Sequence, residues 1–342
     1  MTYNLLEEPW IPVLWSNGKV NRVGIKEALT RAGAIRCICS ASPLDIFAVH
    51  RFLLALLYWR ADLVGGVEQV RASLLKSELS STVIDGIKKE AHCFDLFGEQ
   101  SPFLQDSSVS NTKEKEKKSV GSLFAELATG TNIAHFHHGD DENMRLCLPC
   151  ATLGLLRVVP WTQSGGAGLT PSVHNAPPIM AMATGHNLAI TLGLNLVPLD
   201  TEAGKAQWSG HFKPTDPTGP VPYLEALTWN PRRILLPPAL EGICWYCGDS
   251  NVPTVGKIVY MKNENTKKRS DEKLFEWQDA AAFYAPYDAS KKYDKDKNAP
   301  YKTIKSSQEK SAAKDRDLPD PARSRLPTVF AQNRGHESWL LV

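Results

Sequence analysis

Two pairs of cysteines have the spacing of metal ligands. Cys147 and Cys150 enclose Leu-Pro, and Cys244 and Cys247 enclose Trp-Tyr, so each pair forms a C-x-x-C turn. Such a turn holds two thiolates at about the separation that a tetrahedral metal ion needs, and two turns complete a Cys₄ site. Because a closed Cys₄ site leaves no position for water or substrate, we expect a structural Zn²⁺ ion here and no catalysis.

Two other uses of paired cysteines fit less well. A thioredoxin-like redox pair should open a helix inside a βαβ pattern. Disulfides are disfavoured because no signal peptide leads the sequence, and because Cys37, Cys39 and Cys93 make the number of cysteines odd. The 93 residues between the two turns are too many for a compact zinc ribbon. We therefore expect these residues to form an insertion whose two ends are joined by the metal.

The composition is that of a globular protein with a substantial core. Of 342 residues, 42% are hydrophobic and 22% are charged, which allows one large domain or two ordinary ones. No apolar run approaches the ~20 residues of a membrane-spanning helix. We therefore expect a soluble, cytoplasmic protein with no membrane partner.

Charge is distributed unevenly along the chain. The net charge is +2, but the stretch from Lys257 to Arg325 has 17 Lys or Arg and 12 Asp or Glu, and a basic surface can face phosphates. Within this stretch, alternating charges predict a flexible region at about 287–322. A second flexible loop is predicted from Gln105 to Ser119. Its lysine-rich run at 113–118 is either simply solvated or in contact with a nucleic-acid backbone.

Local patterns favour an α+β fold, a large mixed single domain with short antiparallel sheets and helices over residues 1–342. Asn17-Gly18 predicts a hairpin, and Pro9 and Pro12 suggest that its first strand lies at a sheet edge.

The run from Ser42 to Asp45 is typical of a helix start, with a Ser cap, a Pro at the first helical position and an acid three residues after the cap. An apolar stripe with helical spacing follows. His50 and Arg51 lie beside this stripe, where a salt-bridged or snorkelling role is more plausible for them than metal ligation.

A histidine-rich segment precedes the first cysteine pair. His135, His137, His138, Asp140 and Asp141 have the chemistry of catalytic metal ligands, so a metal-dependent nuclease or other hydrolase is one alternative function. The segment lacks, however, the rigid frame of carboxylates that holds Mg²⁺. We favour a contact loop whose aromatic and histidine rings stack on bases.

A glycine-rich loop comprises Ser164, Gly165, Gly166, Ala167 and Gly168. Glycine at this density lets the backbone approach another molecule closely. The loop lacks the G-x-G-x-x-G and G-K-[ST] patterns of nucleotide-binding loops. Two interpretations stay open, a mobile surface loop and close approach to a DNA groove or an RNA phosphate.

Several separated segments, taken in order, resemble the CasA family, the large subunit of the type I-E CRISPR surveillance complex Cascade. The resemblance runs from residue 1 to about residue 262. Besides the two cysteine turns and the glycine-rich loop, the matching segments are Asn4–Leu6, Pro9–Val13, Ser42–Leu44, Phe94–Phe97, Ser101–Gln105, Thr131–Asn132, Asn175–Pro178 and Leu227–Trp229.

The resemblance implies a subunit that is not an enzyme and that binds crRNA and target double-stranded DNA. It would read the protospacer-adjacent motif (PAM) through the minor groove, where A·T and T·A look alike. It would then help to open the duplex for R-loop formation in antiviral defence. Its partners would be the backbone, handle-binding and small Cascade subunits and a recruited effector nuclease. A zinc-stapled protein–protein adaptor is the remaining alternative.

The resemblance also implies roles for particular residues. The glycine-rich loop would lie against the minor groove, and Lys262, or as second choice Lys257, would enter it. The loop from Asn132 to Met144, with His135, Phe136 and His137, would contact the 5′ handle of the crRNA. The wedge that splits the duplex would be Gln332, Asn333 and Arg334.

One feature of the family is not expected in this sequence. CasA proteins continue into a C-terminal four-helix bundle that contacts the small subunits, guides the displaced strand and contributes to nuclease recruitment. This sequence ends at Val342 without such a bundle. Another polypeptide would supply those roles, or the system would do without them.

Overall fold

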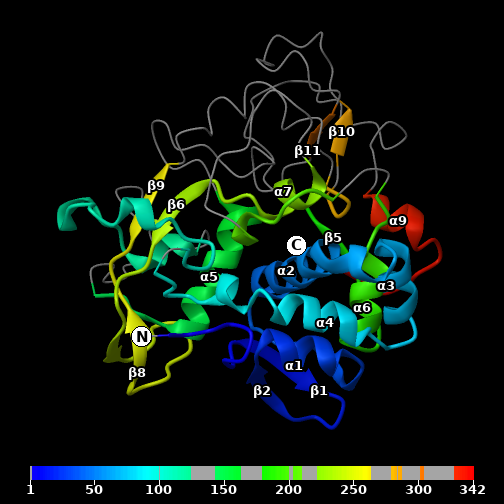
Figure 1. Cartoon of the computed structure of the whole chain (residues 1–342), viewed down its shortest axis with the longest axis horizontal. Coiled ribbons are helices and arrows are strands. Elements are labelled where there is room, and N and C mark those ends of the chain that lie inside the picture. Colours follow the sequence, from blue (N-terminus) through cyan, green and yellow to red (C-terminus); the bar gives the residue numbers. More distant parts are fainter. Residues whose placement is uncertain are drawn as a thin grey trace, which may run out of the picture.

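The computed structural model describes residues 2–99, 101–124, 143–162, 179–199, 203–209, 222–262, 279–282, 284–286, 301–303 and 327–342. In these ranges helices alternate with short antiparallel sheets, which confirms the α+β class (Figure 1). The helices are α1 (Ile25–Thr30), α2 (Pro43–Arg60), α3 (Val67–Leu74), α4 (Ser81–Lys88), α5 (Leu148–Trp161), α6 (Leu188–Asn195), α7 (Tyr223–Thr228) and α9 (Thr328–Gln332). No described helix is both long enough and apolar enough to cross a bilayer.

The described strands pair antiparallel with one another in small sheets. The strands are β1 (Ile11–Trp15), β2 (Val20–Val23), β3 (Ile35–Ile38), β4 (Leu146–Cys147), β5 (Ala181–Ala183), β6 (Arg232–Leu235), β7 (Leu240–Gly242), β8 (Val252–Val255), β9 (Val259–Lys262), β10 (Tyr284–Pro286), β11 (Tyr301–Thr303) and β12 (Trp339–Leu341). The orders are β2-β1-β3, β4-β8-β7, β6-β9, β10-β11 and β12-β5.

The N-terminal hairpin forms as predicted, but its first strand is not at an edge. Gly18 has a φ of +85°, which the tight turn between β1 and β2 requires. Strand β1 lies between β2 and β3, so the edge prediction was wrong. Pro12 is tolerated because the ladder to β3 begins at Val13, and Pro12 contributes only its carbonyl, which accepts a hydrogen bond of 2.8 Å from the Cys39 amide.

Helix α2 runs through the main core. Helices α4, α5, α6 and α7 pack against it (Figure 1). Aromatic rings also pack in this core. The ring centroid of Phe52 lies 5.4 Å from those of Phe103 and Trp208, both in edge-to-face geometry. Such pairs add to the free energy gained by burying the rings. A second core surrounds the cysteine turns, with residues from β4, α5, β6 and β8.

The segment between the two cysteine pairs is not a separate insertion, contrary to the prediction. Helix α5 packs against α2, and helix α6 packs against α3 and β3. Both helices are buried on most sides, so they cannot form an excursion away from the core. The chain between the turns thus contributes to the same core as the N-terminal half.

The predicted flexible loop at 105–119 is ordered. It contains the short 3₁₀ helices η4 (Ser107–Val109) and η5 (Glu114–Glu116), and backbone hydrogen bonds join Lys118 to Ile258 in both directions at 2.8 and 2.9 Å. Of the predicted flexible region at 287–322, strand β11 is described and pairs with β10. The rest of that region lies outside the described residues.

Helix α2 begins where the sequence predicts, but its acidic residue has another role. Ser42 is the N-cap and Pro43 follows it, yet no side chain caps the helix. Asp45 is fully buried, and its Oδ1 lies 2.5 Å from Nε of Arg157 on α5. The hydroxyl of Ser40 donates to its Oδ2 at 2.6 Å. Asp45 therefore joins α2 to α5 through a buried ion pair.

His50 and Arg51 on α2 take separate roles. Arg51 forms a buried ion pair with Asp279, which confirms the salt-bridged interpretation. His50 is buried, and its Nδ1 lies 2.6 Å from the carbonyl oxygen of Ile46. Burial lowers the pKa of His50 to about 4. The ring is therefore neutral near pH 7 and donates to that carbonyl.

We predict that Arg157→Met lowers the free energy of unfolding by about 3–5 kcal/mol, because it leaves the Asp45 carboxylate buried without its cation. The double variant Asp45→Asn/Arg157→Met should lose less than the single Arg157→Met variant, because it removes the uncompensated charge. Urea denaturation of the variants measures these losses. The control is Lys88→Met, whose exposed ion pair with Asp85 should contribute about 1 kcal/mol or less. The single variant Asp45→Asn completes the comparison. If the double variant loses as much free energy of unfolding as the two single variants added together, Asp45 and Arg157 do not stabilise each other.

Candidate metal centre and nucleic-acid face

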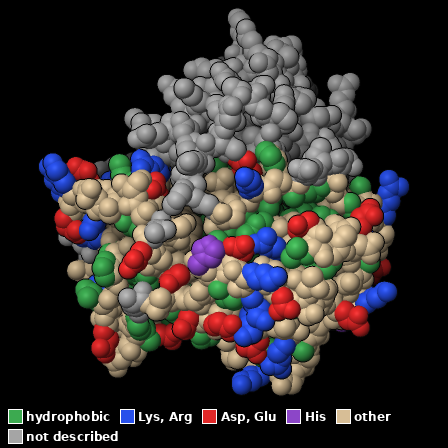
Figure 2. All heavy atoms as spheres, viewed as in Figure 1, with side chains coloured by type: hydrophobic (Ala, Val, Ile, Leu, Met, Phe, Trp, Pro, Cys, Tyr) green, Lys and Arg blue, Asp and Glu red, His purple; other side chains and the backbone are tan. Residues whose placement is uncertain are grey.

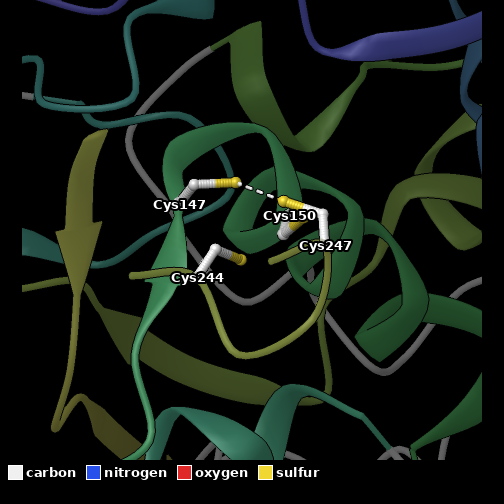
Figure 3. A group of neighbouring side chains, drawn as sticks. All are labelled: Cys147, Cys150, Cys244 and Cys247. Atoms are coloured by element: carbon white, nitrogen blue, oxygen red, sulfur yellow. Dashed lines mark hydrogen bonds between the residues drawn. The ribbon is translucent and has the colours of Figure 1, made fainter. Parts of the chain in front are cut away.

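The four cysteines of the two C-x-x-C turns lie together (Figure 3). Their sulfur atoms all fall within 4.8 Å of one another, and Sγ of Cys147 lies 3.6 Å from Sγ of Cys247. Ligands at the usual Zn–S distance of about 2.3 Å in a tetrahedron are about 3.8 Å apart. No disulfide joins them. The residues present therefore fit a tetrahedral ion with four sulfur ligands.

The first turn is positioned by a strand that runs directly into a helix. Cys147 is the last residue of β4 and the N-cap of α5, and it pairs with Thr254 of β8. Pro149 occupies the first turn of α5, where its missing amide proton costs nothing. Cys150 follows in the same turn, so both thiols lie at the N-terminus of α5, which favours negative charge.

The second turn closes on itself and then bonds to the first. The Gly248 amide donates to the Cys244 carbonyl at 2.9 Å, and Gly248 adopts a φ of +78° that a side chain would strain. The Trp245 amide donates at 2.8 Å to the carbonyl of Arg145, two residues before Cys147. Backbone bonds thus align the two turns without help from the sulfur atoms.

The protonation states of the clustered thiols depend on one another. Hydrogen bonds with Cys147 and Cys150 lower the pKa of Cys244. The hydrogen bonds with Cys147 and Cys244, together with burial, raise the pKa of Cys150. Without a cation, one thiolate is thus stabilised by neighbours that stay protonated. Holding all four as thiolates requires a cation at their centre.

A salt bridge attaches the N-terminal sheet to the second turn. Nη1 of Arg22, on β2, lies 2.8 Å from Oδ2 of Asp249, two residues after Cys247. Cys247 is the exposed member of the four cysteines. The Arg22–Asp249 pair therefore covers the more open side of the cluster.

Tyr246 connects the second turn to the core. Its hydroxyl donates to Oδ2 of Asp45 at 3.0 Å and accepts from Nη2 of Arg157 at 2.9 Å. Its ring stacks on that of Phe124, with centroids 4.9 Å apart. This role of Tyr246 was not predicted from the sequence. Only its place inside the C-x-x-C turn, one residue before Cys247, could have drawn attention to it.

Another group of metal-ligating types occurs among the described residues, formed by Glu90, His92 and Cys93. Glu90 lies 3.3 Å from Arg60, which already compensates its charge. Burial and the neighbouring Glu90 raise the pKa of Cys93 to about 11, so it is a neutral thiol near pH 7. With one ligand paired and another protonated, this group is a weaker metal site than the four cysteines.

The two candidate groove lysines lie at the two ends of the β9 region. Lys257 is exposed in the connection between β8 and β9. Lys262 is the last residue of β9, and it pairs in register with Arg232 of β6. Strand β8 leads back to the metal cluster through its pairing with β4. The lysine-bearing strand is therefore connected to the cysteine turns by one short connection.

Several predicted contact residues lie outside the described residues. They are Asn132, His135, Phe136, His137, His138, Asp140, Asp141, Ser164, Gly165, Gly166, Ala167 and Gly168. The glycine-rich loop follows Thr162, which is described and buried directly after the end of α5. The first cysteine pair thus lies at the N-terminal end of α5, and the described chain stops at Thr162, just after the other end of that helix.

Two of the three candidate wedge residues form hydrogen bonds within the fold. Nε2 of Gln332 donates to the carbonyl of Leu194 at 2.9 Å, and Nδ2 of Asn333 donates to the same carbonyl at 2.7 Å. Both amides thereby stabilise the C-terminal end of α6, and Asn333 is buried. Arg334 is exposed. It is the member of the three best placed to meet another molecule, and the wedge stays a prediction.

Comparison with known proteins gives consistent matches. The family model described as CRISPR-associated protein Cse1 matches residues 4–315. A CRISPR-associated protein CasA/Cse1 of Thermus thermophilus is 35% identical over 213 residues, which are 60% of this chain and 42% of the relative.

Solved structures share the fold. The crystal structure of Thermus thermophilus CasA matches with a TM-score of 0.65 at 23% identity, over 97% of this chain and 64% of that one. A chain of a structure titled CRISPR RNA-guided surveillance complex matches with a TM-score of 0.70 at 16% identity, over all of this chain and 75% of that one. The chain thus spans less than two thirds of the Thermus relatives. With a family model matched over most of its length, the chain belongs to the CRISPR-associated protein Cse1 family, also named CasA.

Proposed function

We propose that this chain is a non-catalytic part of a crRNA-guided type I-E Cascade that recognises the PAM in duplex DNA through the minor groove. It would help to open the duplex for R-loop formation, in the cytoplasm, as antiviral defence. The observation that carries this proposal is the family match over residues 4–315. The surveillance-complex structure that shares the fold supports a place beside crRNA and other Cascade subunits. Target DNA and a recruited nuclease would be further partners, and residues 1–342 would act as one domain.

Two lysines near β9 support the proposal that this chain recognises the PAM through the minor groove of DNA. A narrow minor groove offers the A N3 and T O2 acceptors, which a flexible ammonium group can reach. Lys257 is exposed at the start of this region and Lys262 ends it. The glycine-rich loop after α5 would lie on the same duplex. In such complexes the protein reads a short motif and base pairing reads the rest, so few base contacts suffice.

We further propose that Cys147, Cys150, Cys244 and Cys247 bind a structural Zn²⁺. When bound, the ion would neutralise the thiolates and cross-link two turns that lie far apart in the sequence. Sulfur ligands in a closed set favour zinc over Mg²⁺ or Ca²⁺, which prefer oxygen. The site would stabilise the fold and would influence DNA binding only through it.

We predict one zinc ion per chain in freshly purified, reduced protein, measured by elemental analysis. Cys147→Ser should lower both the zinc content and the melting temperature, because it removes one of four ligands. Cys37→Ser is the matched control, since Cys37 is exposed and distant in sequence from both turns. Protein without zinc, or a Cys147→Ser variant that keeps its full complement, would contradict the assignment.

We predict that Lys262→Ala narrows the difference in affinity between correct and incorrect PAM duplexes. Loss of a base-edge contact typically costs about 1–3 kcal/mol and relaxes specificity at that position. Gly166→Asp should instead weaken binding to every duplex, because it places bulk and negative charge where the backbone must approach. The measurement is the affinity of the assembled complex for duplexes that differ only in the PAM.

Lys257→Ala is the matched variant for this experiment. Unchanged discrimination in Lys262→Ala together with reduced discrimination in Lys257→Ala would move the groove contact to Lys257. If neither lysine variant changes discrimination and Gly166→Asp binds all duplexes normally, PAM reading by this chain is disproved.

We also predict that the purified chain does not cut DNA with Mg²⁺, since the histidine-rich segment has no frame of carboxylates. The assay compares the wild-type chain with the His137→Ala/His138→Ala variant. Cleavage by the wild-type chain that disappears in the variant would favour the nuclease alternative instead.

A further inference from the structure

The segment 106–118, which we call the basic strap, is fixed along the β6–β9 ribbon (Figure 1). At one end the Asp106 amide donates to the carbonyl of Ile234 at 2.8 Å, and Asp106 Oδ2 lies 2.6 Å from Nε of Arg233. Burial raises the pKa of Asp106, but hydrogen bonds from Ser108 and Arg233 outweigh it and lower that pKa. Asp106 is therefore ionised near pH 7, and this end of the strap is anchored by charge.

The other end of the strap is held by a backbone bridge. Lys118 and Ile258 exchange hydrogen bonds in both directions, so they form an isolated antiparallel pair. Between the two ends, the hydroxyl of Thr112 contacts Sδ of Met261 on β9 at 3.8 Å. The strap thus follows β9, which ends at Lys262, and Lys118 pairs with Ile258, the residue that follows Lys257.

The strap presents lysines to solvent. Lys113, Lys115 and Lys118 are exposed, and Lys257 adds a further exposed ammonium group at the same edge. Lys117 is the more buried one and pairs with Glu114 at 2.7 Å. Residues 113–118 contain four Lys and two Glu, so the strap remains cationic after this pairing. Both basic and acidic side chains appear on the surface of the molecule in Figure 2.

The composition of the strap indicates which part of a nucleic acid it fits. It contains no aromatic residue, so it cannot stack on unpaired bases as single-strand binders do. Lysine is a compact point charge that binds phosphate without a fixed geometry. Several such charges on one ordered segment can bind the phosphates of a duplex, and the ordered backbone reduces the entropy lost on binding.

We propose that the basic strap binds the phosphate backbone of the duplex whose minor groove Lys262 or Lys257 enters, through contacts that are independent of sequence. This inference rests on the proposed function, because the duplex must lie at the β9 region for the strap to reach it. The strap would supply affinity and orientation, while the groove lysine supplies discrimination.

The test compares two triple variants in the assembled complex. Lys113→Gln/Lys115→Gln/Lys118→Gln removes the exposed strap charges, and Lys19→Gln/Lys88→Gln/Lys89→Gln removes the same charge from exposed positions on the β1–β2 turn and α4. The affinity for PAM and non-PAM duplexes is measured over a range of salt concentrations. The plot of log K against log salt has a negative slope, and each lost phosphate contact should make this slope less steep by about 0.9.

We expect the strap variant to bind every duplex about tenfold or more weakly at 0.1 M salt, with a salt slope smaller by about 1–3. The ratio between PAM and non-PAM duplexes should stay at its wild-type value, and the control should match the wild type. The strap carries its charges at exposed positions, so equal melting temperatures for both variants verify that they fold.

Four outcomes would overturn the proposal. If the strap variant binds duplexes as tightly as the control variant, the strap does not touch DNA. In that case the proposed function still stands, provided that the wild-type complex discriminates between PAM and non-PAM duplexes. A changed PAM ratio shows that the strap reads bases. Failure of the strap variant to join the complex shows that its partner is a protein subunit. A wild-type complex without PAM discrimination overturns the proposed function itself and the strap with it.

Discussion

The buried carboxylate of Asp45 is the group on which the two cores of this structure depend. A carboxylate removed from water costs several kcal/mol unless a cation and hydrogen-bond donors replace the lost hydration. Arg157 supplies the cation from α5, and Tyr246 supplies a donor from inside the second cysteine turn. Withdrawal of Tyr246 would leave this buried pair with fewer partners. Closure of the cysteine turns and packing of α2 against α5 therefore stabilise each other, and a metal ion at the cysteines would strengthen both.

This arrangement places β8 and β9, with the candidate groove lysines Lys257 and Lys262, next to the cysteine turns. Helix α5 runs from the first cysteine pair to Trp161, and the glycine-rich loop follows it closely. Strand β8 pairs with β4 beside the same cysteines and leads through Lys257 into β9. A recognition site needs its groups held within a fraction of an ångström, which elements packed on a core achieve better than free loops. The four cysteines thus lie where α5 begins and where β4 pairs with β8, the strand that leads to Lys257 and β9.

The features predicted from sequence are those that local pattern determines. The start of α2 at Ser42 and the hairpin at Gly18 depend on neighbouring residues, and the C-x-x-C spacing by itself indicates a shared metal. The features missed depend on partners far along the chain. Asp45 looks like a capping acid until Arg157, 112 residues away, is placed beside it. The charged run at 113–118 has the composition of a flexible loop, and its order comes from β6 and β9, which no local pattern in the run reveals.

A protein that reads only a short motif has few base contacts from which to gain affinity. Each such contact contributes about 1–3 kcal/mol of discrimination, while non-specific phosphate contacts supply much of the total binding energy. A net charge of +2 is too small to attract DNA strongly by overall charge. Basic groups must therefore be concentrated where the duplex lies, and they must be held in place so that binding does not pay for ordering them. If Lys257 or Lys262 enters the groove as proposed, a lysine-rich segment bonded to β6 and to Ile258 would satisfy both conditions, because the backbone bonds that order it would also set its distance from the motif.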